Sequence, residues 1–537
     1  MKHRIFLALL LCLSLMTGCV VGADGLDLND MFSKRDLRTD YDPADSIAIT
    51  LNGSSAACSA PSVKISGSTV TITDDGTYIL RGTLDNGMII VDADDEKVQI
   101  VLDGAHITSA TSAPLYVRQA DKVVVTLAES SENTLKNGGS FVAIDSSDID
   151  AAVYSRDDIT LNGSGSLTVE SPAGHGIVSN DDLILTGGAI TVNAASHGLS
   201  ANDSVRMRDV TMAITAGKDG IQAEHDDPED GYVYMESGTL AITSGGDGIS
   251  ATGEMLLTGG TVSITSGGGI DGESNSSCKG LKAGGNLTVT GGTHAIDASE
   301  DALHTNVSLT VSGGTITASA GDDALHADAD LTISGGTISV PTSAEGIEGH
   351  RVTISGGTIT VNAADDGLNA AGPQEISGHS ADPDAYIRIT GGDLFINADG
   401  DGIDSNGDLT VSGGSIVVAG PTRGGNSAVD YSGSAAITGG TMIAYGTSDM
   451  AQGFGKGSTQ GAILLDTGSM PAGTDIVLSD GSSELMRTTA EKAFSCVLVS
   501  VPGMVQNGTY TVSVGSESHT VSLDGYQYSN VHGRFRH

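Results

Sequence analysis

Short stretches in the middle of the chain alternate between apolar and polar positions. In LTIS (331–334), Leu331 and Ile333 would face one side and Thr332 and Ser334 the other, and TITV (358–361) alternates in the same way. This period of two is typical of half-buried strands. A Gly-Gly pair separates the two strand patterns, and a third segment of the form acid-Gly/Ala-Ile/Leu-x-Ala follows a turn. The pattern predicts one rung of a parallel β-helix.

The rung repeats at a nearly fixed period. Successive Gly-Gly pairs begin at Gly291, Gly313, Gly335 and Gly356, so the spacing is 22, 22 and 21 residues. A fixed period of this size indicates stacked structural units. We therefore expect an all-β protein whose residues 46–445 form a right-handed single-stranded parallel β-helix.

Three insertions and the last part of the chain depart from the period. The insertions are HDDPEDGY (225–232), GGGIDGESNSSCKG (267–280) and AGPQEISGHSADPD (371–384), and we expect them to be surface loops. Residues 446–537 contain short strand patterns of an antiparallel type, such as FSCVLVSV and GTYTVSVG. They predict a small β cap or a small separate β domain.

Composition and charge narrow the class of protein. The chain has 537 residues, of which 75 are Gly and 39% are hydrophobic; aromatic residues make up 4% and Trp is absent. Small and aliphatic residues suit the tight corners and narrow core of a solenoid. The net charge of −42 argues against a nucleic-acid partner and suits divalent cations.

The N-terminus has the layout of a secretion signal. Basic residues 2–4 precede the apolar run 5–15, and Met16-Thr17-Gly18-Cys19 resembles a bacterial lipobox. We expect residues 1–18 to be a lipoprotein signal peptide, Cys19 to be lipidated, and residues 19–45 to be a flexible tether. The protein would then be extracytoplasmic and anchored to a membrane; cleavage by an ordinary signal peptidase is the alternative.

The cysteines beyond the signal region show no pattern of their own. Cys58, Cys278 and Cys496 are widely spaced and odd in number. They form neither a disulfide framework nor a zinc-binding spacing.

The third segment of each rung carries a row of mostly acidic residues. Aligning the rungs on the Gly/Ala-Ile/Leu pair gives one row of Asp219, Asp247, Lys279, Asp301, Asp323, Glu345, Asp366 and Asp401, continued by Ser427. Three residues later a second row holds Gln222, Ser250, Lys282, His304, His326, Glu348, Asn369, Asp404 and Asp430. Further acids precede the first row at Glu300, Asp322, Asp365 and Asp399.

Stacked carboxylates need an explanation because they repel one another. Rungs lie about 4.8 Å apart, so neighbouring charges cost roughly 1 kcal/mol in water and several kcal/mol when partly buried. Calcium, which takes six to eight oxygen ligands, would remove this cost. Alternatively, Asp residues recur because they make turns. The candidate metal ligands are Asp301, Asp323, Glu345, Glu348, Asp366, Asp399, Asp401, Asp404 and Asp430.

Catalysis is possible but not required by the pattern. A polysaccharide lyase would combine calcium with a Lys or Arg base, for which Lys279 and Arg423 are the candidates. No pair of carboxylates is singled out for glycoside hydrolysis. His294, His304 and His326 lack a transition-metal spacing and read as an outward ladder. We therefore favour a non-catalytic protein.

The combined pattern resembles a known family. The lipobox, the irregular β start, the LTISGGTITVxAxxDGL rungs and the tail AFSCVLVSVPGMVQNGTYTVSVG are similar to bacterial secreted carbohydrate-binding β-helix proteins over roughly residues 46–525. The resemblance implies a pectate-lyase-like fold, calcium binding, and attachment to cellulose and polygalacturonate without established cleavage.

These observations together predict a calcium-binding, surface-anchored, monomeric polysaccharide-binding protein. Two alternatives stay open. One is a calcium-dependent lyase of the pectate type, and the other is a structural or adhesive surface protein.

Overall fold

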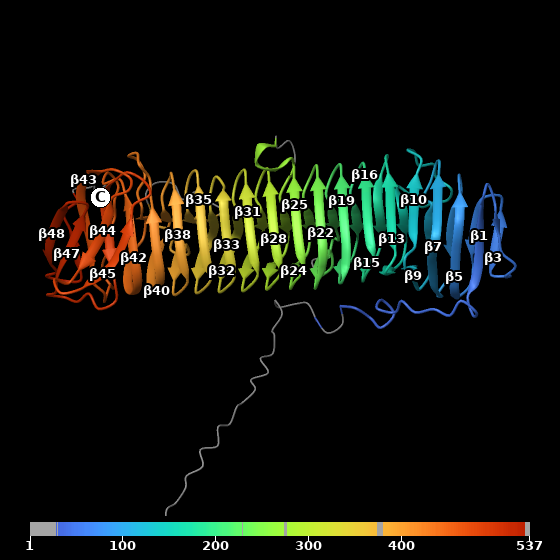
Figure 1. The fold of residues 1–537 in the computed structure, drawn as a ribbon, viewed down its shortest axis with the longest axis horizontal. Helices are drawn as coiled ribbons and strands as arrows, with labels where there is room; N and C mark the ends of the chain where they lie inside the picture. The colour runs from blue at the N-terminus through green and yellow to red at the C-terminus, as the bar shows by residue number, and fades with distance from the viewer. Residues whose placement is uncertain (1–27, 29–30, 228, 273–276, 373–379, 532–537) are drawn as a thin grey trace, which may run out of the picture.

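The computed structural model describes residues 28, 31–227, 229–272, 277–372 and 380–531. These residues form 49 strands and one short 3-10 helix, η1 (Gly269–Asp271), arranged as a long stack (Figure 1). Within the described residues, no helix has the length and hydrophobicity needed to cross a membrane. The predicted signal peptide and Cys19 lie outside the described residues.

One rung consists of β27 (Leu287–Val289), β28 (Thr293–Ala298) and β29 (Leu303–Thr305). The Gly-Gly pair forms the corner between the first two strands. Gly292 has a φ of 88°, which L side chains rarely adopt, and a Cβ on Gly291 would lie 2.5 Å from the carbonyl oxygen of Thr258. Both glycines are therefore required, which is why the pair marks every regular rung.

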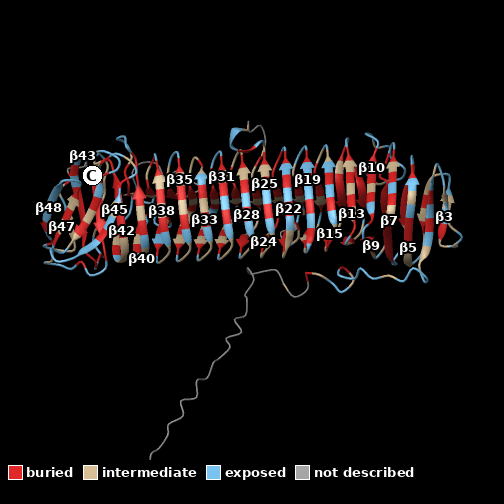
Figure 2. Ribbon diagram, viewed as in Figure 1, coloured by how far each residue is buried: buried red, intermediate tan, exposed pale blue. Residues whose placement is uncertain are grey.

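Equivalent residues of successive rungs pair in parallel register. Leu287 pairs with Leu309, and Leu309 with Leu331, each one sequence period further on. These inward-facing leucines are fully buried, whereas Thr315, which heads a strand of the second sheet, is exposed. Buried and exposed positions alternate along many strands of the stack (Figure 2). The predicted parallel β-helix is confirmed.

The stack has three parallel sheets, named here by the order of their strands within a rung. The first sheet contains β9 (Lys122–Leu127), β12 (Ile159–Gly163), β15 (Asp182–Leu185), β18 (Ser204–Met207), β21 (Tyr232–Met235), β24 (Met255–Leu257), β27, β30 (Ser308–Val311), β32 (Leu325–Ile333), β34 (Ile347–Ile354), β37 (Tyr386–Ile389), β40 (Asp408–Ala419) and β42 (Ala435–Gly446). The second sheet contains β10 (Glu132–Asn137), β13 (Ser166–Ser171), β16 (Ala189–Ala194), β19 (Val210–Ala216), β22 (Gly238–Ser244), β25 (Thr261–Ser266), β28, β31 (Thr315–Ala320), β33 (Thr337–Thr342), β35 (Thr358–Ala363) and β38 (Asp393–Ala398), and continues into β40 and β42.

The third sheet is made of the shortest strands and carries the acidic rows. It contains β4 (Thr69–Ile72), β6 (Met88–Asp92), β8 (Leu115–Gln119), β11 (Ala151–Ser155), β14 (His175–Ser179), β17 (Leu199–Ala201), β20 (Ile221–Ala223), β23 (Ile249–Ala251), β26 (Leu281–Ala283), β29, the first residues of β32 and β34, β36 (Leu368–Ala370), β39 (Ile403–Ser405) and β41 (Asp430–Tyr431). The N-terminal rungs add β1 (Ile47–Gly53), β2 (Ala56–Ala57), β3 (Val63–Ser66), β5 (Gly76–Leu84) and β7 (Lys97–Ser109).

The C-terminal region covers the end of the stack. Its strands are β43 (Ala462–Met470), β44 (Asp475–Ser479), β45 (Glu484–Thr489), β46 (Phe494–Ser500), β47 (Thr509–Val514), β48 (Glu517–Ser522) and β49 (Gln527–Ser529). β46 runs antiparallel to β42, which ends the parallel order and covers its open edge. β45, β44, β47 and β48 form a separate antiparallel sheet, whose apolar side chains pack with those of β40, β42, β43 and β46. The predicted small β addition is present.

Residues 31–38, which we call the strap, lie against the outer side of the first sheet (Figure 1). Asp36 is 1% exposed; its carboxylate contacts Lys122 Nζ at 2.6 Å and accepts a 2.6 Å hydrogen bond from Thr160. Met31 packs with Tyr234 and Leu256. The described part of the expected tether therefore makes specific contacts with the β-helix.

Candidate metal centre

The middle residues of the third-sheet strands form a continuous row on the outside of the β-helix, which we call the outer column. Strand register places in it Gln222, Ser250, Lys282, His304, His326, Glu348, Asn369, Asp404 and Asp430. The row three residues earlier, which we call the turn column, is joined by main-chain hydrogen bonds between rungs, such as Gly346 N to Asp366 O at 2.9 Å. The alignment made from the sequence is confirmed.

In most turn-column aspartates, one carboxylate oxygen accepts a hydrogen bond from a main-chain amide of the next rung. The amide of Asp247 donates to Oδ1 of Asp219 at 2.8 Å, and the amide of Asp401 donates to Oδ1 of Asp366 at 2.6 Å. The amide of Ser427 donates in the same way to Asp401. An aspartate here thus ties its rung to the next, which explains its recurrence. The second oxygen of each carboxylate is left for other partners.

The rungs that carry Asp247, Asp301 and Asp323 supply their own positive charge, and we call them the basic half. Its ion pairs are Lys282 Nζ–Asp247 Oδ2 at 3.2 Å, Lys279 Nζ–Asp301 Oδ2 at 2.6 Å, His304 Nδ1–Asp301 Oδ2 at 2.8 Å and His326 Nδ1–Asp323 Oδ2 at 2.7 Å. Burial alone would raise the pKa of Asp301, but His304 and Lys279 hold it at about 2. Each of these three carboxylates therefore has a cation of the chain beside it, although burial and the neighbouring acids still raise the pKa of Asp323 to about 6.

His326 acts as a fixed cation. Its Nδ1 lies 2.7 Å from Asp323 and its Nε2 lies 3.1 Å from Asp328, so each ring nitrogen faces a carboxylate. Burial opposes the charged ring, but these bonds raise the pKa of His326 to about 9. It stacks on His304 with ring centroids 4.9 Å apart. A ring that donates from both nitrogens has no lone pair for a metal, although His326 lies within 4.8 Å of ligand oxygens of Asp323 and Glu348.

The rungs from Glu345 to Asp430 form the acidic half, and three of their carboxylates converge. Oxygen atoms of Asp366, Asp401 and Asp404 lie within 4.8 Å of one another. Burial and mutual repulsion raise the pKa of Asp404 to about 8 and the pKa of Asp366 and Asp401 to about 7. Across the described residues, no Lys, Arg or His forms an ion pair with these three.

Asn369 connects this cluster to the preceding rung. Its Nδ2 donates to Glu345 at 2.7 Å and to Glu348 at 2.9 Å. Burial and Glu345 raise the pKa of Glu348. Asn369 is 8% exposed, and its Oδ1 has no hydrogen-bond partner among the described residues. A buried carbonyl oxygen without a donor is an unsatisfied acceptor and a ready ligand for a hard cation.

A glycine makes room beside the same carboxylates. A Cβ on Gly400 would lie 2.3 Å from Oδ1 of Asp365 and 2.5 Å from Oδ1 of Asp366. Only glycine allows the turn to approach these oxygens so closely. The three converging side chains offer carboxylate oxygens, and this donor set fits calcium rather than a softer metal. Asp366, Asp401, Asp404 and the Asn369 carbonyl would hold the ion.

The remaining predicted ligands are placed differently. Asp430 follows Asp404 in the outer column, and one of its oxygens accepts from Gln452. Asp399 is exposed and pairs with Lys492 of the C-terminal region at 2.7 Å. Asp301 and Asp323 converge with Asp322 in a separate group within 4.8 Å, but this group belongs to the basic half, where Lys279, His304 and His326 contact Asp301 and Asp323.

The two candidate lyase bases are not brought together. Burial favours the neutral amine of Lys279, but Asp301 and Glu300 raise its pKa above the ordinary value, the opposite of what a base at neutral pH requires. Arg423 lies exposed in the loop between β40 and β41.

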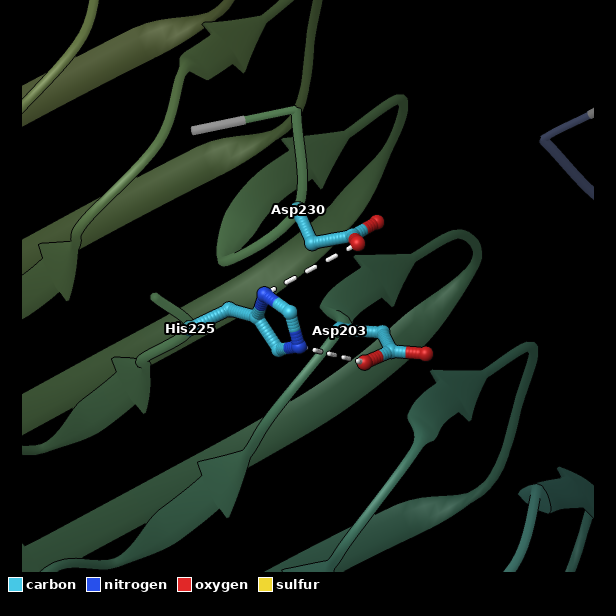
Figure 3. A group of neighbouring side chains, drawn as sticks. All are labelled: Asp203, His225 and Asp230. Atoms are coloured by element: carbon cyan, nitrogen blue, oxygen red, sulfur yellow. Dashed lines mark ion pairs between the residues drawn. The ribbon is translucent and has the colours of Figure 1, made fainter. Parts of the chain in front are cut away.

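A second group of ligand-type side chains lies at the opposite end of the third-sheet strands (Figure 3). His225 Nε2 is 3.9 Å from Asp203, and His225 Nδ1 is 3.8 Å from Asp230. The carboxylates therefore face different ring nitrogens, and Nδ1 already accepts the amide of Asp227 at 2.9 Å. We therefore interpret these three side chains as contacts that hold the loop, rather than as ligands that converge on one metal ion.

The chain is thus a parallel β-helix whose third sheet carries a row of polar and charged side chains, many with oxygen atoms, on its outer side. The family model described as "Carbohydrate-binding domain-containing protein" matches residues 66–324 and 322–525, so the chain belongs to this family. The resemblance drawn from the rungs and tail is confirmed.

Two relatives are similar to parts of the chain. A carbohydrate-binding domain-containing protein of Acetivibrio thermocellus is 35% identical over 200 residues, which are 36% of this chain and 65% of the relative. A solved polysaccharide lyase-like protein from C. thermocellum, as its gadolinium derivative, is 34% identical with a TM-score of 0.43, and the match covers 45% of this chain and 96% of that one.

Proposed function

We propose that the acidic half of the outer column binds calcium and, through it, an acidic polysaccharide such as polygalacturonate. The carrying observation is the convergence of Asp366, Asp401 and Asp404 within 4.8 Å, without an ion pair from any described side chain. The basic half has the same backbone geometry and includes its own cations. Asp366, Asp401 and Asp404 have no such cation among the described residues, so an external cation is the charge that balances them.

Each side chain has a separate task in this proposal. Oδ1 of Asp366 and Oδ1 of Asp401 are held by amides of the following rungs, which fixes both carboxylates without using their second oxygens. Asp404 presents its carboxylate from the outer column, and Asn369 adds a neutral oxygen. Calcium would supply a positive charge with coordination positions that the protein does not fill.

The family supports a polysaccharide as the ligand of that ion. Free positions on calcium take carboxylate or hydroxyl oxygens of a sugar. An acidic glycan gains most, because the ion joins two polyanions that would otherwise repel, and this chain has a net charge of −42. Cellulose offers no carboxylate and would rely on hydroxyl contacts alone.

The location of the protein is part of the same proposal. The signal-like segment and the lipobox-like sequence before Cys19 support export and lipid anchoring. The test is fractionation of cells that express the full chain. The protein should move from the membrane to the soluble fraction in the Cys19→Ser variant, and an unchanged distribution would contradict the anchor.

Binding to polygalacturonate in calcium and in EDTA tests the function. Calcium should strengthen binding by the wild type, and the triple variant Asp366→Asn, Asp401→Asn, Asp404→Asn should lose this calcium-dependent gain. Asp393→Asn, an exposed change on the same rung, is the matched control. Equal binding in EDTA would contradict the proposal. Steady growth of the absorbance of unsaturated uronate would establish the lyase alternative instead.

A further inference from the structure

A polar cleft of about 560 Å³ lies between the strap and the N-terminal rungs, separate from the outer column. The strap contributes Arg35 and Arg38. Strands β5 and β7 contribute Thr77 and Gln99, and Gln99 is 7% exposed. The volume is within the range of sites for small ligands, which is about 300–1,000 Å³.

Arg35 is an unpaired cation in a strongly acidic protein. Its Nε is buried and has no hydrogen-bond partner among the described residues, and no ion pair to its guanidinium is found there. Arg38 also lines the cleft, and among the described residues its one ion pair is with Asp40, at 3.4 Å and with both side chains exposed. Burial and the charge of Arg38 lower the pKa of Arg35. Asp121 and Asp36 act in the opposite sense, but neither forms an ion pair with the guanidinium, which can therefore take an anionic partner.

The acidic side chains that line the cleft do not form an ion pair with Arg35. Asp75, Asp95 and Glu96 are exposed on the rim, where water screens them. Asp121 is engaged by Lys97 at 3.0 Å. Rim carboxylates are acceptors for hydroxyl groups, so the cleft combines a half-buried cation with several hydroxyl acceptors.

The strap holds Arg35 in place without using the Arg35 side chain. A chain of hydrogen bonds crosses the rungs from Thr77 to Gln99 (3.1 Å), from Gln99 to Thr126 (3.0 Å), from Thr126 to Asn162 (2.8 Å), and from Asn162 to the carbonyls of Asp36 (3.1 Å) and Arg38 (2.9 Å). The strap thus completes a polar network that the rungs begin. The guanidinium is left available for a ligand.

We propose that this cleft is a second, calcium-independent carbohydrate site that takes a sugar acid. The carboxylate of the sugar pairs with Arg35 and Arg38, and its hydroxyl groups donate to the rim carboxylates. The inference rests on the carbohydrate-binding family and on the cleft, and it does not require calcium at the outer column. Two separate sites on one rigid β-helix would let a single polymer bind with a gain in avidity.

Calorimetric titration of the full chain with D-galacturonate in EDTA tests the site. Arg35→Ala should weaken binding at least about tenfold, since a charge-assisted pair is lost. Lys34→Ala removes the same charge from an exposed neighbouring position of the strap and should leave binding unchanged. Hydrogen exchange at residues 31–38 checks that the strap stays docked in both variants.

Three outcomes would overturn the proposal. They are no binding of galacturonate in EDTA, equal binding by wild type and Arg35→Ala, or equal binding of D-galactose or inorganic sulfate, which lack the carboxylate and the sugar hydroxyls respectively. The calcium-dependent attachment to polygalacturonate serves as the separate readout of the outer column. The Arg35→Ala variant should keep its calcium-induced thermal shift, so failure of one site is distinguishable from failure of the other.

Discussion

The basic and acidic halves of the outer column share one backbone design and differ in how charge is balanced. In both, turn-column aspartates accept amide hydrogen bonds from the following rung. In the basic half Asp301 meets Lys279 and His304, and the pKa of Asp301 falls to about 2. In the acidic half Asp404 meets other carboxylates, and its pKa rises to about 8.

Comparing the two halves separates the structural role of the aspartates from their capacity to bind a cation. Amide bonding alone accounts for aspartate at the turns, because both halves have it. What differs is the outer column, where Lys282, His304 and His326 give way to Glu348, Asn369 and Asp404. His326 stands at the border, 2.7 Å from Asp323 and 3.6 Å from Glu348. We therefore expect only the rungs that follow His326 to need an external cation.

The dependence of stability on pH should show the largest contrast. The pKa of Asp366 and of Asp401 is raised to about 7 and that of Asp404 to about 8, so the folded state holds more protons than the unfolded state from about pH 4 upward. In EDTA, stability should therefore fall as pH rises from 4 to 8, by on the order of several kcal/mol.

Two controls sharpen that measurement by chemical denaturation. Calcium keeps the carboxylates ionised and should flatten the fall. Asp301, whose pKa is lowered to about 2, acts in the opposite sense: its stabilisation is present above about pH 4 and disappears as pH drops toward 2. A flat profile in EDTA between pH 4 and 8 would show that the acidic half is already neutralised.

Breaking an internal ion pair should cost stability that calcium does not restore. Lys279→Met removes the ammonium from Asp301, which is 4% exposed, and should destabilise the protein by about 3 kcal/mol. Lys97→Met is the matched control, because its pair with Asp121 is exposed and should cost less than about 1 kcal/mol. A full rescue of Lys279→Met by calcium would mean that the basic half also takes the ion.

Neutralising the acidic half should abolish the stabilisation of the protein by calcium. In wild type, calcium at a hundredfold excess over its Kd adds about 2.7 kcal/mol. The triple variant Asp366→Asn, Asp401→Asn, Asp404→Asn keeps an oxygen at each amide bond but removes the repulsion. At pH 8 in EDTA it should melt above wild type, and calcium should no longer raise its Tm. A calcium shift equal to that of wild type would place the ion elsewhere.

The rungs and their register follow from the sequence because their causes are local. Gly-Gly corners and alternating strands repeat in each rung, so aligning a few residues placed Asp366, Asp401 and Asp404 correctly. The partners of each carboxylate could not be read in the same way. Lys279 and Asp301 were in one row, yet only side-chain directions show that they pair and that Asp404 finds no cation.

Contacts that lie outside the repeat were out of reach for the same reason. Lys492 reaches Asp399 from 93 positions further along the chain, and Asp36 meets Thr160 across 124 positions. Neither has a period that could reveal it. Asn369 had been aligned in the outer column, but its unsatisfied oxygen depends on the orientation of one amide.

Asn369 offers the smallest and most specific test of the comparison. Asn369→Leu removes the unsatisfied oxygen and should weaken calcium binding about tenfold, or about 1.4 kcal/mol. Gln222→Leu makes a matched change in the outer column away from the acids and should have no effect on it.

The Asn369→Asp variant tests whether Asn369 is a calcium ligand or only bridges Glu345 and Glu348. An added carboxylate should strengthen calcium binding, because calcium affinity rises with the charge of its ligands, and should destabilise the calcium-free protein by repelling Glu345 and Glu348. If Asn369 only bridges those two side chains, Leu and Asp should both weaken calcium binding, since both lose the Nδ2 donor. Opposite shifts in calcium affinity, measured by titration, would place Asn369 among the ligands and fix where the acidic half begins.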